Sequence, residues 1–151
     1  MAGIVLNLQA SSRGILEAKP LREKILVLQD EMLKLPQAEV PVKHYYANGF
    51  YAREMTMQKG CALVGKIHKS EHLCIISKGD VDVVSEEKTE RLKAPYTFVS
   101  KVGAKRAIYA HEETVWTTVH LTGETDLDKL EDELIAESFE QIEPEKISCH
   151  L

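Results

Sequence analysis

The residues of this sequence whose types could bind a ligand gather in one stretch, residues 60–80. Lys66 and His68 are separated by one residue in a run of strand-forming residues, so a strand would point both side chains to the same face. A turn around Ser70 would then start a second strand that begins near His72. Two adjacent strands can therefore present several side chains of ligand-binding type to one opening.

A second group of such residues lies in the run 114–121. Trp116, Thr118 and His120 alternate along it and share one face of the expected strand. If that face is the interior of the fold, His120 joins the two histidines above. Trp116 is the single tryptophan, and such a residue packs in a core or at its rim more often than it stacks on a ligand.

The elements expected to position these residues are short strands. From residue 40 to about 121, runs rich in β-branched and aromatic residues alternate with glycine and proline turn signals, and no helix-length pattern interrupts them. This pattern is typical of an all-β sandwich or barrel and argues against a βαβ fold. The charged stretch 86–93 is expected to be a solvated hairpin turn. The expected strands are 51–57, 62–68, 73–77, 81–84, 96–99, 106–109 and 114–121.

Both flanks of this β region are expected to be helical. Apolar residues spaced by three and four mark one helical stripe over 20–35, which we expect to pack on its own domain. A second helix is expected from Thr125 to about Phe139, followed by a flexible acidic tail. The domain organisation is thus an N-terminal extension over 1–39 whose first 19 residues are loose, a barrel over 40–122, and a C-terminal helix and tail over 123–151.

Composition and charge limit the function classes. With 19 Lys and Arg against 24 Asp and Glu, the net charge is −5, which argues against a nucleic-acid backbone binder. Nine of the acidic residues follow residue 125, so the remainder of the chain is slightly basic and suits an anionic ligand. Three cysteines without paired spacing suit a reducing compartment. No apolar run approaches the ~20 residues of a membrane span, and no signal peptide is recognised.

The stretch 60–79 resembles the first sequence motif of the cupin superfamily, G-x5-H-x-H-x3-4-E-x6-G. Both glycines of the motif are in register. Its three ligand positions fall on Lys66, His68 and His72, so the middle histidine is kept and the first is replaced by lysine. The glutamate of the motif is replaced by His72 or shifted to Glu71. In the second cupin motif only Gly103 matches, and Arg106 stands at the histidine position.

Beyond the superfamily, residues 44–124 resemble small cupin-like proteins of tailed bacteriophages. This resemblance implies an all-β, cupin-type double-stranded β-helix barrel flanked by an N-terminal and a C-terminal helix. It also implies a viral protein located in the host cell cytoplasm or in the virion, and it assigns no mechanism. The residues that carry it are 44–49, 51–54, 65–73, 94–95, 103–106 and 111–120.

Two interpretations of the barrel mouth remain open. A metal centre would use His68, His72 and His120, with Glu71 and His111 in reserve, and would suit Fe, Mn, Ni or Zn. A pocket without metal is the interpretation that the sequence favours, because two cations at cupin ligand positions repel a divalent ion and attract an anion such as phosphate, carboxylate or a nucleotide. The predicted ligand-binding residues are Lys66, His68, Glu71, His72, Arg106, Trp116 and His120.

From these residues we first expect a non-catalytic protein that binds a small anion or nucleotide in the infected host. The alternatives are a metal-dependent cupin enzyme, such as a dioxygenase, isomerase or epimerase, and a virion or assembly accessory protein. No nucleophile elbow or phosphate-binding glycine loop is present, and no catalytic residue is assigned. A homo-oligomer, most simply a dimer, is expected because exposed sheet edges invite pairing.

Overall fold

A computed structural model describes residues 20–142 of the chain. The expectations of a loose N-terminus over 1–19 and of a flexible tail beyond 142 therefore lie outside the described residues. No helix within 20–142 is long and apolar enough to cross a membrane. The elements in chain order are α2 (Leu21–Leu33), β1 (Val42–Ala47), β2 (Phe50–Met57), β3 (Ala62–Val64), β4 (Ile67–His68), β5 (His72–Lys78), β6 (Asp80–Val84), β7 (Thr89–Lys93), β8 (Tyr96–Ser100), β9 (Ala107–Ala110), β10 (Thr114–Leu121), α3 (Leu127–Leu134), β11 (Ile135–Ala136) and the 3₁₀ turn η2 (Phe139–Gln141).

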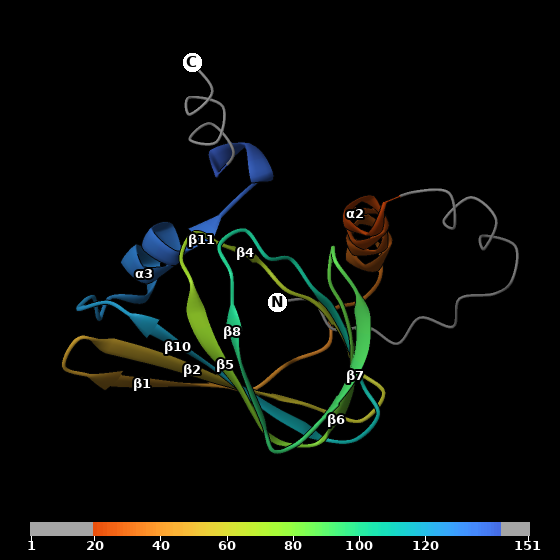
Figure 1. Cartoon of the computed structure of the whole chain (residues 1–151), viewed down its shortest axis with the longest axis horizontal. Helices are drawn as coiled ribbons and strands as arrows, with labels where there is room; N and C mark the ends of the chain where they lie inside the picture. Colours follow the sequence, from red (N-terminus) through yellow and green to blue (C-terminus); the bar gives the residue numbers. More distant parts are fainter. Residues whose placement is uncertain (1–19, 143–151) are drawn as a thin grey trace, which may run out of the picture.

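The strands pair as one long antiparallel hairpin that is rolled up. β2 pairs with β10, β3 with β9, β5 with β8, and β6 with β7, so that early strands meet late ones in nested order. Rolling adds the pairs β10–β5 and β6–β9 and yields a five-stranded sheet, β1-β2-β10-β5-β8, facing a four-stranded sheet, β3-β9-β6-β7 (Figure 1). This strand order is a jelly roll. The fold is an all-β, cupin-type double-stranded β-helix with a flanking helix at each end, as the sequence predicted.

The core lies between the two sheets, where alternate residues of each strand point inward. Met57, Ile76, Val81 and Ala110 are fully buried there, and Trp116 packs edge-on against Phe98. The two helices pack on the outside of the barrel (Figure 1). Since helices this short gain most of their stability from burying one face, their packing sites decide where they form.

Helix α2 packs on the barrel through Ile25 and Met32, which contact Val64 and Ala107. α3 packs through Leu130 and Leu134. The predicted helix over 20–35 corresponds to α2. The second helix is shorter than predicted, because Ile135 and Ala136 leave the helix to pair with β4. Its N-cap is Asp126, and not Thr125; the Asp126 carboxylate accepts hydrogen bonds from the N–H groups of Asp128 and Lys129.

The predicted strands differ from the observed ones at three places. The run 62–68 is interrupted at Gly65 and Lys66, so it forms two strands, β3 and β4. The stretch 86–93 is not only a turn, because residues 89–93 form β7 and pair with β6. Strand β1 was not predicted, since its exposed, polar pattern lacks the apolar alternation that identifies a strand.

Candidate metal centre

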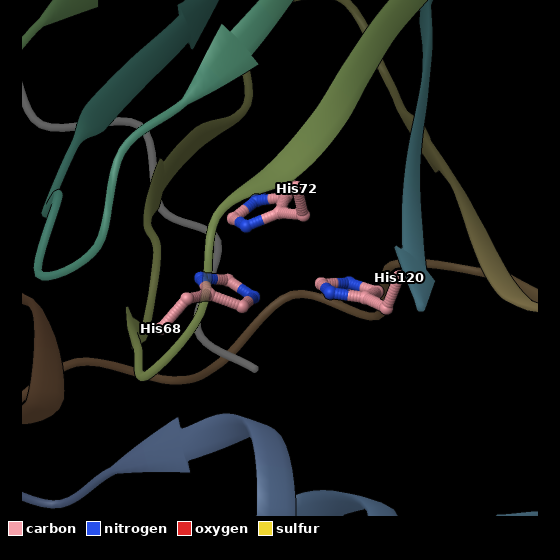
Figure 2. A group of neighbouring side chains, drawn as sticks. All are labelled: His68, His72 and His120. Atoms are coloured by element: carbon pink, nitrogen blue, oxygen red, sulfur yellow. The ribbon is translucent and has the colours of Figure 1, made fainter. Parts of the chain in front are cut away.

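Three histidines from three strands meet at one end of the barrel. His68 ends β4, His72 begins β5 and His120 lies near the end of β10 (Figure 2). Their ring centroids are 4.3 Å apart for His68 and His72, 4.6 Å for His72 and His120, and 5.4 Å for His68 and His120. One ring nitrogen of each lies within 4.8 Å of those of the other two. This spacing allows all three imidazoles to ligate one ion.

Strand register places two of these histidines, and the C-terminal segment places the third. β10 and β5 are antiparallel neighbours, and Thr118 lies opposite Cys74. His120 is two residues after Thr118 and His72 is two residues before Cys74, so these two histidines lie side by side on the inward face. His68 pairs with Ile135 of β11. Its carbonyl also accepts a hydrogen bond of 2.9 Å from the Gly103 N–H. β4 is thus held between the C-terminal segment and the loop that precedes β9.

Hydrogen bonds orient two of the rings. Nδ1 of His72 lies 3.1 Å from the Ser70 carbonyl, which can only accept, so Nδ1 carries the proton and Nε2 is free to ligate. Nε2 of His120 lies 3.1 Å from Thr118 Oγ1. Within residues 20–142, Nδ1 of His120 is buried and has no hydrogen-bond partner. A buried polar atom of this kind calls for a ligand, water or ion.

Burial keeps the cluster neutral. Burial first, and then the neighbouring histidines, Arg106 and Arg53, together lower the pKa of His68 to about 3. Burial, then His72 and Arg53, lower the pKa of His120 to about 4. The pKa of His72 is also lowered, chiefly by burial. Metal ions bind the neutral form of imidazole. These three side chains are already neutral at pH 7, so they can bind a metal ion without first losing a proton.

The residues present therefore fit a divalent transition metal. Three neutral nitrogen donors suit Zn, Cu, Fe and Ni, and three protein ligands leave a coordination position for another molecule. The oriented His72 ring and the unpartnered Nδ1 of His120 are what such a site requires.

A cavity of about 320 Å³ adjoins the cluster. Its apolar wall includes Met55, Leu63, Ile108 and Trp116, which come from both sheets. The lining also includes polar residues and residues of α3 and β11: His44, Tyr51, Arg53, Lys66, His68, His72, Arg106, Thr118, Leu127, Leu130, Glu131 and Ile135.

No protein-family model matches this sequence, and no curated protein matches it. Solved structures with a similar fold include the cupin domain of Schizosaccharomyces pombe Cnp3, with 19% identity, a TM-score of 0.48, and coverage of 64% of this chain and 72% of that one. A cupin family protein with a double-stranded β-helix fold from Methanocaldococcus jannaschii has 14% identity, a TM-score of 0.48 and coverage of 56% and 82%. An acetylacetone dioxygenase from Acinetobacter johnsonii has 15% identity, a TM-score of 0.47 and coverage of 58% and 66%. The strand order of this chain, and not these low similarities, carries the cupin fold.

Arg106, which the sequence placed in the site, lines the cavity. It donates a hydrogen bond of 2.8 Å from Nη1 to Ser100 Oγ, and its guanidinium lies 5.2 Å from the centre of the Phe98 ring. Burial lowers its pKa, although an arginine remains charged at any physiological pH. Trp116 lines the cavity and is also a core residue, with 3% of its surface exposed.

Two other predicted residues lie differently from the expectation. Lys66 sits at the exposed rim, where its Nζ is paired with Glu131 of α3, because the strand break at Gly65 ends the alternation that would have turned it inward. Glu71 is exposed in the turn before β5 and lies outside the cavity lining. The reserve ligand His111 is also remote from the cluster, with Nε2 2.8 Å from Asp82 Oδ2.

Sequence reasoning missed Arg53, Tyr51 and Glu131, which are among the polar residues that line the cavity. Arg53 lies between the buried Tyr51 and Met55 at spacings of two along β2, so all three share one face, and the same argument could have predicted that Arg53 points inward. The Tyr51 hydroxyl is 2.8 Å from His44 Nδ1, and its ring stacks on His120. Glu131 gave no local signal, since only the packing of α3 over the barrel end brings it to the cavity.

The lowered histidine pKa values predict a pH dependence of stability in chelator-treated protein. Unfolded histidines take up protons near pH 6.5, whereas the folded cluster takes them up only near pH 3–4, so the unfolded state binds more protons in between. The free energy of unfolding should therefore fall as the pH drops from about 6.5 towards 4. Urea unfolding across this range measures it. A variant with Asn at positions 68, 72 and 120 should show a flatter dependence, and equal slopes would contradict the prediction.

Proposed function

We propose that this protein binds one divalent transition metal ion through His68, His72 and His120 and holds a small anionic molecule against it. The observation that carries the proposal is the convergence of three neutral imidazoles, those of His72 and His120 buried and that of His68 half-buried, beside a cavity of about 320 Å³. When bound, the metal would supply a Lewis acid that accepts an oxygen of the anion.

Charge at the site supports an anion. Arg53 contributes to the lowered pKa of His68 and His120, and Arg106 contributes to that of His68 and His72, so positive charge lies near the cluster from β2 and from the loop before β9. Three neutral imidazoles do not neutralise a divalent ion. An anionic ligand would offset the metal charge and pair with the Arg106 guanidinium. Arg106, one of the two cations that argued against metal on sequence alone, therefore suits a metal that carries an anionic ligand.

The cavity also constrains the body of that ligand. Its volume is at the small end of the roughly 300–1,000 Å³ of small-molecule sites, and its inner wall is apolar. Both features favour a small carboxylate with an apolar body over a nucleotide, which would bring additional polar groups to bury.

The test uses protein loaded with Co²⁺ and benzoate as the probe. Native mass spectrometry should detect one metal per chain, and benzoate should perturb the visible absorption of the bound Co²⁺. Replacing Arg106 with Gln should lower benzoate affinity at least about 10-fold, because a hydrogen bond to a charged group contributes about 1.5–3 kcal/mol. Metal content should be unchanged. Lys101→Gln, at an exposed position outside this cavity, is the matched control. Equal benzoate affinity in both variants would refute the anion site.

A metal-dependent enzyme is the second candidate, favoured by the Tyr51 hydroxyl. Tyr51 lines the same cavity, and its hydroxyl lies 2.8 Å from His44 Nδ1, so the two groups together can exchange a proton with a bound molecule. Native mass spectrometry of a ligand that is retained through purification distinguishes the enzyme from the binding protein. An enzyme would convert that ligand when metal is supplied, whereas a binding protein would release it unchanged.

The cellular setting of this proposal comes from the sequence resemblance to tailed-phage proteins. A protein of that origin would act on a small molecule in the cytoplasm of the infected host, or as an accessory of the virion. Mass spectrometry of purified particles and of infected cells would separate these locations.

A further inference from the structure

A second cavity, of about 450 Å³, lies between the edge strands of the two sheets, and we call it the side cavity. β8 is the edge of the five-stranded sheet and β7 is an edge of the four-stranded sheet. Both strands line the side cavity, for example through Leu92 and Phe98, and α2 and η2 contribute Arg22 and Phe139. None of the three clustered histidines lines it, although Arg106 lines both cavities. The side cavity is therefore a separate place for a ligand.

Lys105 is a buried cation in the lining of the side cavity, with only 5% of its surface exposed. Its Nζ donates hydrogen bonds of 2.7 Å to Gln29 Oε1 and 2.9 Å to the Gly65 carbonyl, and both acceptors are uncharged. Burial lowers the pKa of this ammonium, and no carboxylate of residues 20–142 pairs with it. An ammonium has three N–H donors, so one remains for a ligand. Because a buried charge is costly unless it is paired, Lys105 calls for an anion.

Two further cations come from the same loop, residues 101–106 between β8 and β9. Arg106 is half-buried and donates its hydrogen bond to the uncharged Ser100 hydroxyl. Lys101 is exposed, and like Lys105 and Arg106 it lines the side cavity. Within the described part of the chain, none of these three cations forms an ion pair with a carboxylate. The loop thus gives the side cavity an excess of positive charge.

The other cations of the lining are paired. Arg22 of α2 donates a hydrogen bond of 2.7 Å to Glu86 in the turn between β6 and β7, and Lys88 of the same turn is paired with Glu90. Glu87, also in this turn, is exposed. In all, the lining has five cations against three carboxylates. The unbalanced positive charge therefore belongs to the loop 101–106.

Aromatic side chains line the side cavity from two elements. Tyr96 and Phe98 are neighbours on β8, with ring centroids 5.8 Å apart. Phe139 of η2 lies under the Arg22 guanidinium, 3.7 Å from its ring centre. Tyr96 is 40% exposed, so a ring stacked on it would keep its own polar groups in contact with water. Aromatic rings beside cations are the surroundings in which proteins stack the base of a nucleotide and hold its phosphate.

We propose that the side cavity binds a phosphate monoester with an aromatic body, such as a nucleoside monophosphate. The phosphate would accept hydrogen bonds from Lys105 and Arg106, and the aromatic body would lie against Tyr96 and Phe98. A phosphate monoester carries a charge of about −1.5 to −2 at pH 7 and three strong acceptor oxygens, so it balances several cations better than a single carboxylate does. This proposal does not depend on the proposed metal centre.

Calorimetric titration of the chelator-treated full chain with AMP tests the proposal, and adenosine is the matched ligand without a phosphate. We expect one AMP per chain with a Kd below about 1 mM, and at least about 10-fold weaker binding of adenosine. Lys105→Met keeps the apolar stem of the side chain and removes the ammonium. It should weaken AMP binding at least about 10-fold. Lys59→Gln, at an exposed position outside the side cavity, is the control and should bind AMP unchanged.

A second variant keeps the test decisive if Lys105→Met fails to fold. Tyr96→Ala should weaken AMP binding about 5-fold or more, because base–aromatic stacking contributes to affinity on this scale. Its control is Tyr109→Ala, since Tyr109 is exposed to the same degree, 39%, but lies outside the side cavity. Circular dichroism establishes which variants are folded.

Four results would overturn this assignment. One is a full chain that does not bind AMP at millimolar concentration, and another is adenosine that binds as tightly as AMP. A third is equal AMP affinity in the folded cavity variants and their controls. The fourth is loss of AMP binding in chelator-treated His68→Ala, which would place AMP in the cavity beside the histidines. We expect that variant to lose metal and keep AMP, so failure of the metal centre and failure of the side cavity are distinguishable.

Discussion

Replacing His68 with alanine is expected to lower the affinity for Co²⁺ or Zn²⁺ more than about 100-fold. Loss of a residue that merely supports a ligand costs about 10–100-fold, and loss of one of three ligands should exceed this. The His68 ring lies beside both of the other rings. Its removal leaves only two nitrogen donors, those of His72 and His120, to hold the ion. Titration of chelator-treated protein by calorimetry, with elemental analysis of the metal retained after dialysis, measures the change.

The control for this variant is His111→Ala. His111 is a histidine of the same barrel, but it lies beside Asp82 and outside the cluster, so metal affinity should not change. Circular dichroism establishes that both variants are folded. If His68→Ala binds metal as tightly as the control does, His68 is not a ligand and the three-histidine centre is wrong.

Replacing Gly79 with alanine is expected to destabilise the fold by about 2–5 kcal/mol. Gly79 links β5 to β6, where the chain passes from one sheet to the other, and its φ is +104°. A left-handed backbone costs a residue with a side chain about 1–2 kcal/mol. An added Cβ would also lie 2.7 Å from the Glu113 carbonyl oxygen and closer still to the Thr114 hydroxyl, an overlap that adds about 1–3 kcal/mol.

Gly49→Ala separates the two contributions. Gly49 also has a positive φ, +82°, but a Cβ there meets nothing within 4 Å, so only the backbone cost of about 1–2 kcal/mol applies. Urea unfolding at a constant m-value gives the difference between the two variants. Equal losses of stability would mean that the backbone relaxes around Gly79 and that the close approach to β10 is not a constraint.

Local features of the sequence determined the type of most elements. Glycines at 49, 79 and 103 adopt positive φ, as the turn signals suggested, and apolar alternation located the strands that have one buried face. The same alternation turned His72, His120 and Trp116 inward. It failed for Lys66, because alternation holds only while a strand continues and the strand breaks at Gly65.

The composition of the site was decided by the tertiary structure. His68 and His72 are close in the chain, but His120 reaches them only because the rolled hairpin makes β10 a neighbour of β5. Glu131 neutralises Lys66 only because α3 packs across the same end of the barrel. The physical reason is that side-chain direction follows from local backbone geometry, whereas the pairing of distant strands depends on burying the whole core at once. The sequence by itself thus determined which residues point inward, and the tertiary structure decided that three histidines meet there while one of the two expected cations stays at the rim.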